Sequence, residues 1–139
     1  MSARCPVCRT KVYVESLDCP TCSAPIAFHP PTREFVALPG DPAPEAGARV
    51  EVDETAWRAC VNRDRQCNWL APDGADSGAC LSCRLTRRRP DDGDTLALER
   101  LAEASQDKRR LLVQLLDLGL PITPYDERPG GLAFDLLSS

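Results

Sequence analysis

Residues 5–22 read CPVCRTKVYVESLDCPTC, and this stretch decides the fold of the first part of the chain. It holds two CxxC pairs separated by ten residues. A CxxC turn brings two thiolates together and points backbone N–H groups at their sulfur atoms, which suits a bound zinc ion. The first segment, residues 1–38, is therefore predicted to be a zinc ribbon, a small antiparallel sheet tied at one end by four thiolates.

Three short stretches of this segment are predicted to be strands. Residues 11–15 read KVYVE, and the alternation indicates a strand with both valines on one face. Residues 25–28 and 34–38 are predicted to form a hairpin, turned by the sequence HPPTR at 29–33.

A second set of cysteines follows in residues 60–83, which read CVNRDRQCNWLAPDGADSGACLSC. If each set binds its own metal, the closed loops contain ten and twelve residues. Interleaved pairing would have to close loops across residues 39–56, at a larger entropy cost. We therefore expect sequential pairing and two zinc ions. The predicted zinc ligands are Cys5, Cys8, Cys19, Cys22, Cys60, Cys67, Cys80 and Cys83.

Metal binding is favoured over disulfide bonds. Three of the four cysteine pairs are CxxC, a spacing that disulfide frameworks have no reason to repeat. The first ten residues show no apolar signal segment, and no stretch approaches the roughly 18 apolar residues of a membrane span. We expect a cytoplasmic protein without membrane association, whose thiols stay reduced. Iron bound by the same cysteines, in a rubredoxin-like electron-transfer site, is a minor alternative that visible absorption would reveal.

The front of the chain has little else to stabilise it. Of the 17 leucines among 139 residues, five lie in the first 95. Small domains with so little apolar mass generally need a metal or a covalent link to fold. We expect metal removal to unfold residues 5–83.

The segments around the second cysteine set differ in composition. Residues 39–56 are rich in Pro, Gly, Ala and acidic side chains and are predicted to be a linker. Residues 57–90 are predicted to be a second zinc module, again with four cysteine ligands. We expect Trp57 and Trp69 to pack beside its metal as a miniature core.

Residues 91–120 are predicted to be helical. Asp94 is the expected N-cap of a helix spanning Leu96–Leu118, and Gly119 and Pro121 are its expected stop. Its predicted apolar stripe consists of Leu101, Ala104, Lys108, Leu111, Leu115 and Leu118. Residues 105–110 interrupt this apolar face, so a kinked helix or two helices is the alternative.

Residues 121–139 are predicted to be a connection and a short terminal strand at 132–137, for which the sequence offers no partner strand. The expected fold class is small α+β: two zinc-stabilised ribbon-like β modules, then a long α-helix and a short terminal strand.

Catalytic signals are missing from the sequence. A zinc ion held by four thiolates has no open position at which to activate water. His29 is the single histidine and is predicted to be a turn residue, and HExxH is absent. We expect this chain, as it stands, not to be an enzyme.

Charge gives a second hypothesis. The net charge of -4 argues against a general nucleic-acid binder. A basic patch at Arg84–Arg89, with Arg63 and Arg65 adding to it, nevertheless makes a nucleic-acid-binding zinc ribbon the alternative. Some cations could instead offset the formal charge of -2 of each site. The candidates are Arg4, Arg9 and Lys11 at the first site and Arg58 and Arg84 at the second.

Several motifs along the chain form a combination typical of one family. They are CPVC and CPTC, Phe28 with Val36-Ala37-Leu38, Trp57 with Cys60-Val61-Asn62, CNWL at 67–70, CLSCRLTR at 80–87, LGLP at 118–121 and GLAFD at 131–135. This combination resembles the N-terminal zinc-ribbon region of a family of bacterial zinc-binding metallopeptidases. The resemblance implies a C-terminal catalytic domain with HExxH after the GLAFD strand. The family's catalytic residues belong to that domain and match no position of this sequence, so none is carried over. It also implies that the eight cysteines bind zinc in a non-catalytic scaffold or interaction module. The expected partner is that catalytic domain or another protein, contacted through the long helix.

Overall fold

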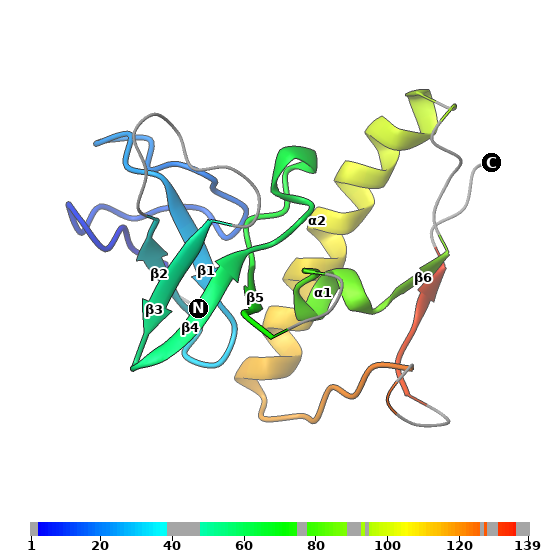
Figure 1. Ribbon diagram of the computed structural model, residues 1–139. Coiled ribbons are helices and arrows are strands. Elements are labelled where there is room, and N and C mark those ends of the chain that lie inside the picture. The colour runs from blue at the N-terminus through cyan, green and yellow to red at the C-terminus, as the bar shows by residue number, and fades with distance from the viewer. Residues whose placement is uncertain are drawn as a thin grey trace. The chain divides into compact units, whose positions relative to one another are not determined.

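A computed structural model of the protein describes residues 3–38, 48–74, 78–88, 93, 95–125, 127 and 131–135 (Figure 1). The chain divides into two compact units, Met1–Cys80 and Leu81–Ser139. Within the described residues, no helix has the length and hydrophobicity that a bilayer span requires. The predicted α+β class is confirmed, with small sheets, one long helix, a short terminal strand and two four-cysteine clusters.

The first unit begins with the expected hairpin. Strand β1 (Ile26–His29) pairs antiparallel with β2 (Glu34–Ala37), with Phe28 opposite Phe35. The turn is closed by a hydrogen bond from the Arg33 backbone N–H to the His29 carbonyl at 2.8 Å. All four residues of β1 are buried, so this strand lies inside the unit.

A three-stranded antiparallel sheet follows, in the order β3 (Arg49–Val52), β4 (Thr55–Ala59) and β5 (Leu70–Pro72). Strands β3 and β4 are joined at Asp53 and Glu54, which both have positive φ, as a tight hairpin turn requires. The structure therefore differs from the linker predicted at 39–56. The valines of β3 are half-buried and alternate with exposed charged residues, and this period-2 pattern outweighs the Pro- and Gly-rich composition before it. Residues 39–47 lie outside the described part of the chain.

The core of the first unit joins segments that were predicted to belong to separate modules, 1–38 and 57–90. Ala27 and Leu38 are buried together with Ala59 and Leu70 of the second sheet. Phe28 and Trp69 lie with their ring centroids 5.2 Å apart, and both are fully buried.

The two tryptophans have different surroundings. Trp69 lies two positions after Cys67 and is buried, as expected for a core residue beside the second cysteine set. Trp57 is only partly buried, in β4, and makes an edge-on contact with the His29 ring at 4.7 Å between centroids. The two indoles therefore do not share one miniature core.

The strand predicted at 11–15 is absent from this described segment. Only an isolated bridge between Arg4 and Lys11 is formed there, although Val12 is buried. The chain turns within this stretch, where the Ser16 backbone N–H donates to the Tyr13 carbonyl at 3.0 Å, so no ladder forms beyond the bridge at Lys11.

The second unit contains α1 (Leu81–Arg84), β6 (Thr86–Arg88), α2 (Thr95–Asp117) and β7 (Phe134–Asp135). The prediction of one long helix ending before Gly119 is confirmed. Gly119 has φ +73, and the backbone N–H groups of Gly119 and Leu120 donate to the carbonyls of Leu116 and Leu115. This pair of hydrogen bonds is a Schellman C-cap. The N-cap predicted at Asp94 lies outside the described residues.

The buried face of α2 differs from the predicted stripe. Leu112 and Val113 are buried, whereas Leu111 and Leu118 are exposed, Leu118 by 73%. Lys108 lies on the buried face as predicted, but it is there as a hydrogen-bonding cation.

The terminal strand has a partner that the sequence did not reveal. β7 pairs in parallel with β6, and the Phe134 backbone N–H donates to the Leu85 carbonyl at 2.7 Å. The arginine-rich composition of 86–88 hid this strand. Residues 136 and 137 of the predicted strand lie outside the described part.

Candidate zinc centres

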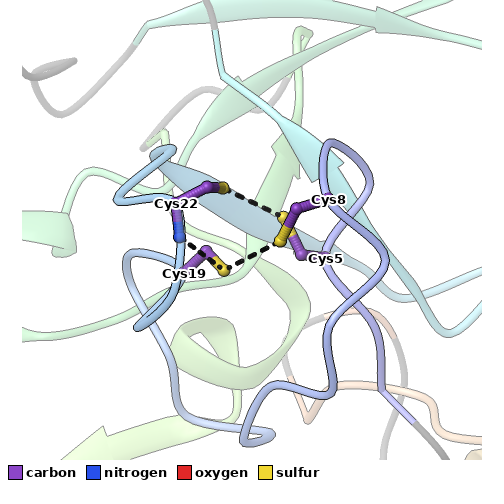
Figure 2. A group of neighbouring side chains, drawn as sticks. All are labelled: Cys5, Cys8, Cys19 and Cys22. Atoms are coloured by element: carbon purple, nitrogen blue, oxygen red, sulfur yellow. Dashed lines mark hydrogen bonds between the residues drawn. The ribbon is translucent and has the colours of Figure 1, made fainter.

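The first cysteine group is assembled by the two CxxC turns. The Sγ atoms of Cys5, Cys8, Cys19 and Cys22 all lie within 4.8 Å of one another. Figure 2 shows them converging from the two turns, with Cys5 and Cys22 Sγ 3.7 Å apart and Cys8 and Cys19 Sγ 3.6 Å apart. Four sulfurs placed tetrahedrally at a Zn–S distance of about 2.3 Å are about 3.8 Å from each other. The group therefore has the dimensions of a zinc site.

The two turns share one backbone pattern. In each, the first cysteine donates its N–H to the carbonyl five residues later, Cys5 to Thr10 and Cys19 to Ala24, both at 2.9 Å. The fourth residue after each cysteine has positive φ. The N–H of the second residue after each cysteine points at its sulfur, at 3.3 Å for Cys5 and 3.4 Å for Cys19. These N–H donors favour the thiolate form that binds zinc.

The second group forms around a single-turn 3-10 helix, η1 (Arg63–Arg65). The Sγ atoms of Cys60, Cys67, Cys80 and Cys83 also lie within 4.8 Å of one another. Cys67 and Cys80 Sγ are 3.6 Å apart, and the Cys80 N–H points at Cys60 Sγ at 3.4 Å. The structure thus brings the eight cysteines together in the two sets that sequential pairing predicts.

All eight cysteines are free thiols, and the two groups fit two zinc ions. The groups differ in burial. Cys8 and Cys22 of the first group are exposed, whereas Cys60, Cys67 and Cys80 of the second group are buried. Both groups offer four thiolates, so a zinc ion bound there would be saturated and structural.

The thiols of the first group differ in acidity. The Thr10 hydroxyl, 3.3 Å from Cys8 Sγ, and the Thr10 backbone lower the pKa of Cys8 to about 6. A hydrogen bond from the Ala24 backbone acts to lower the pKa of Cys22, but desolvation and the neighbouring thiols outweigh it and raise this pKa to about 12. Zinc binding at neutral pH must therefore displace protons from sulfur.

His29 belongs to neither cysteine group. It ends β1, is buried, and its Nδ1 lies 2.7 Å from the Thr32 hydroxyl. Burial lowers the pKa of His29, although Asp53 and Glu34 act in the opposite direction. The structure differs from the predicted turn residue, because His29 is the last residue of β1 and pairs with Glu34, and the turn follows it.

Two of the basic side chains proposed as a nucleic-acid patch are paired with carboxylates. Arg84 donates to Glu127 at 2.8 Å, and Arg87 donates to both carboxylate oxygens of Asp135 at 2.7 and 3.0 Å. Arg63 is buried, so it cannot contribute to an exposed patch. Arg89 lies outside the described residues. The nucleic-acid alternative receives no support from this arrangement.

The cations expected to offset the charge of the second zinc site also have carboxylate partners. Arg58 donates to Asp73, and Arg84 pairs with Glu127 as above. Near the first site, Arg4 donates to the Arg9 carbonyl at 3.2 Å. A buried cation that was not expected to offset the charge of the second site lies near it. This residue is Arg63, which interacts electrostatically with Asp18 and Cys67.

Sequence reasoning missed the structural role of Arg63 and did not single out Asn68. Both are buried polar residues of the second cysteine segment. Asn68 lies directly between a cysteine ligand and a buried tryptophan, and this position could have predicted its burial.

Residues 2–94 match the family of zinc-ribbon domains, and the chain belongs to this family. It is 35% identical over 137 residues to protein Mb2598c of Mycobacterium bovis and to protein Rv2568c of Mycobacterium tuberculosis, both described as uncharacterized. The match covers 97% of this chain and 36% of each relative, so the chain spans about a third of the length of these relatives. No solved structure matches it significantly.

Proposed function

We propose that this zinc-binding chain is a non-catalytic scaffold and interaction module, in which two structural zinc ions hold the fold and the second unit contacts a protein partner. The saturated thiolate sites support the first half of this proposal, since neither leaves a coordination position for water or substrate.

The observation that carries the second half is a set of exposed leucines on and after α2. Leu96 and Leu111 are exposed by 57% and 44%, and Leu118 and Leu120 just after the helix by 73% and 48%. At 3.6 residues per turn, Leu96, Leu111 and Leu118 lie within an arc of about 60° around the helix axis. Exposed leucines that share one side of a helix favour a protein contact over plain solvent exposure.

The partner that we propose is a further domain of a longer polypeptide. Nearly two thirds of each mycobacterial relative lies outside the region that it shares with this chain. The resemblance of the sequence motifs to bacterial zinc-binding metallopeptidases is the reason for proposing that this domain is a peptidase domain with HExxH. The test is direct: the relatives' sequences outside the shared region should contain HExxH, and its absence would remove the peptidase part of the proposal.

Binding would be tested with the part of Rv2568c outside the aligned region, titrated against this chain in a calorimeter. Leu111→Glu combined with Leu118→Glu should weaken binding by at least about tenfold, because both leucines would lose apolar burial. Glu99→Lys changes the charge by the same amount at an exposed position of α2 outside this arc and is the matched control. Equal affinities of the double variant and the control would contradict docking through this surface.

The non-catalytic assignment has its own test. The purified zinc-loaded chain should not hydrolyse peptides. Hydrolysis that a chelator abolishes while the circular dichroism spectrum stays unchanged would show that the assignment is wrong.

We also propose that the protein works in the cytoplasm. The support is that its eight cysteines are free and grouped for metal, an arrangement that a reducing compartment preserves.

A further inference from the structure

Two side chains from residues 60–83 bind the loop that connects the two CxxC turns of the first cysteine group. Arg63 Nη2 donates to the Leu17 carbonyl at 2.9 Å. Asn68 Nδ2 donates to the carbonyls of Val14 and Ser16 at 2.8 and 2.9 Å. The partners are 46 to 54 positions apart in the sequence, so no local structure accounts for these contacts.

The donors of these hydrogen bonds belong to buried side chains. Asn68 is fully buried, and Arg63 is 9% exposed. A buried donor that loses its acceptor carries the full cost of its desolvation. If the segment containing Val14, Ser16 and Leu17 moved away, both side chains would lose these acceptors.

The donors and acceptors are directly connected to zinc ligands. Asn68 follows Cys67, and the Arg63 backbone N–H donates to the Cys60 carbonyl at 2.9 Å. On the other side, Leu17 lies two positions before Cys19. Zinc at the second site would fix the backbone that carries Arg63 and Asn68, and zinc at the first site would fix the carbonyls that they bind.

The Leu17 carbonyl is shared with the core. It accepts the Ile26 backbone N–H at 3.0 Å as well as Arg63, while the Asn68 carbonyl accepts the Phe28 N–H at 2.7 Å. The hydrogen bonds between residues 14–17 and residues 63–68 are therefore part of a network that includes the buried strand β1. A displacement of either segment would be transmitted to the other through these contacts.

We propose that Arg63 and Asn68 couple the two zinc sites, so that zinc bound at one site raises the zinc affinity of the other. They act as positioning residues and are not zinc ligands. Because coupling of binding equilibria is reciprocal, each site must change the affinity of the other by the same factor. The inference depends on zinc occupancy of both groups and not on the proposed docking role of α2.

The first experiment uses the unaltered chain. Reduced, metal-free protein receives one equivalent of zinc, and native mass spectrometry counts the forms with zero, one and two ions. Coupling predicts a smaller one-zinc fraction than two independent sites would give with the affinities measured for the single-site variants described below. A one-zinc fraction equal to or above that independent-site value would overturn the proposal.

Variants then test the two residues. Arg63→Met keeps much of the side-chain length without the donors, and Asn68→Leu is similar in size without the amide. Each should raise the one-zinc form and reduce the ratio of the two stepwise affinities by about tenfold, within the range typical of coupled sites. Arg65→Met, at an exposed position on the same 3-10 helix, is the control and should behave as the unaltered chain.

A general loss of stability would lower mainly the first zinc affinity, because that step also folds residues 5–83, and would raise the ratio of the second affinity to the first. Loss of coupling lowers this ratio, so the two effects can be told apart. If Arg63→Met does not fold, Arg63→Lys keeps the charge and one donor group but not the planar fork, and it should give an intermediate one-zinc fraction. Variants with the same distribution as the unaltered chain would overturn the role of these residues.

Reciprocity is tested with one site removed at a time. Cys5→Ser with Cys8→Ser leaves the second site, and Cys60→Ser with Cys67→Ser leaves the first. Competition with a coloured chelator should show that each remaining site loses affinity by the same factor, of about tenfold. In the Arg63→Met background this loss should largely disappear. An undiminished loss there would assign the coupling to other contacts and overturn the proposal.

Discussion

Lys108 of α2 donates a hydrogen bond from Nζ to the backbone carbonyl of Ser82 in α1, at 2.8 Å. The ammonium group also bonds to the Thr86 hydroxyl and lies 5.9 Å from the centre of the Phe134 ring. Lys108 is 5% exposed. One buried cation thus connects α2 to α1, β6 and β7.

Replacing Lys108 by methionine should destabilise the second unit. The change keeps most of the apolar side chain but leaves the Ser82 carbonyl without this donor, so the free energy of unfolding should fall by about 1–3 kcal/mol. Denaturation followed by circular dichroism of the helix measures it. Arg100→Met, at an exposed position of α2, is the control, and equal losses for both variants would contradict the role of Lys108.

Gly119→Ala should destabilise the end of α2 by about 1 kcal/mol. Gly119 has φ +73, a conformation that costs an L-residue about that amount, and an added Cβ would meet nothing within 4 Å. The cost is therefore conformational and not steric. Gly74→Ala also meets nothing within 4 Å, without a positive φ, and should be neutral or slightly stabilising. Thermal denaturation compares the two, and a neutral Gly119→Ala would contradict the C-cap assignment.

His29 should titrate below its ordinary pKa of 6.5, because burial disfavours its charged form. The unfolded chain then takes up the proton first as the pH falls. The contribution of His29 to stability is present above pH 6.5 and is lost as the pH falls towards the folded pKa. An NMR titration of the zinc-loaded protein gives the folded value. Glu34→Gln should lower it further, since the Glu34 charge raises it, and a folded pKa at or above 6.5 would refute the prediction.

The first zinc ion should be lost to a chelator before the second. Cys8 and Cys22 are exposed, so a chelator can approach their metal, whereas three ligands of the second site are buried. Timed alkylation with mass spectrometry should label Cys8 and Cys22 before Cys60 and Cys67. Simultaneous labelling of all eight cysteines would show that burial does not control release.

Generic duplex DNA or RNA should not bind tightly at physiological salt. Arg84 and Arg87 face Glu127 and Asp135, and these pairs would have to break before phosphate could bind. Binding measured at several salt concentrations should therefore show no steep slope. A slope equivalent to several phosphate contacts would revive the nucleic-acid alternative.

Much of the fold follows from local sequence signals. The two CxxC turns predict the first cysteine group, and the short loops of sequential pairing predict the second, in which Cys60 and Cys67 are separated by six residues. Gly119 predicts the end of the helix, and the turn at 29–33 predicts the hairpin, because each depends on a few neighbouring residues.

The parts that sequence did not predict depend on distant partners. Strand β6 consists of arginine and threonine, and its pairing with β7 is decided by a segment 48 positions away. Arg63 and Asn68 are polar residue types that usually lie at the surface, and the distant carbonyls of Val14, Ser16 and Leu17 satisfy donors that would otherwise be buried without a partner. No composition or periodicity within one segment carries that information.

The matched hydrogen bonding of the Cys5–Thr10 and Cys19–Ala24 turns has a consequence for protein engineering. Because amide groups specify both turns, the intervening side chains, such as the exposed Val7, contribute little to the geometry of the cage. The two hexapeptides share this hydrogen bonding, so a ribbon assembled from one of them in duplicate should still enclose its metal. The exposed side chains of these turns can thus be replaced to create a new binding surface without redesigning the metal site.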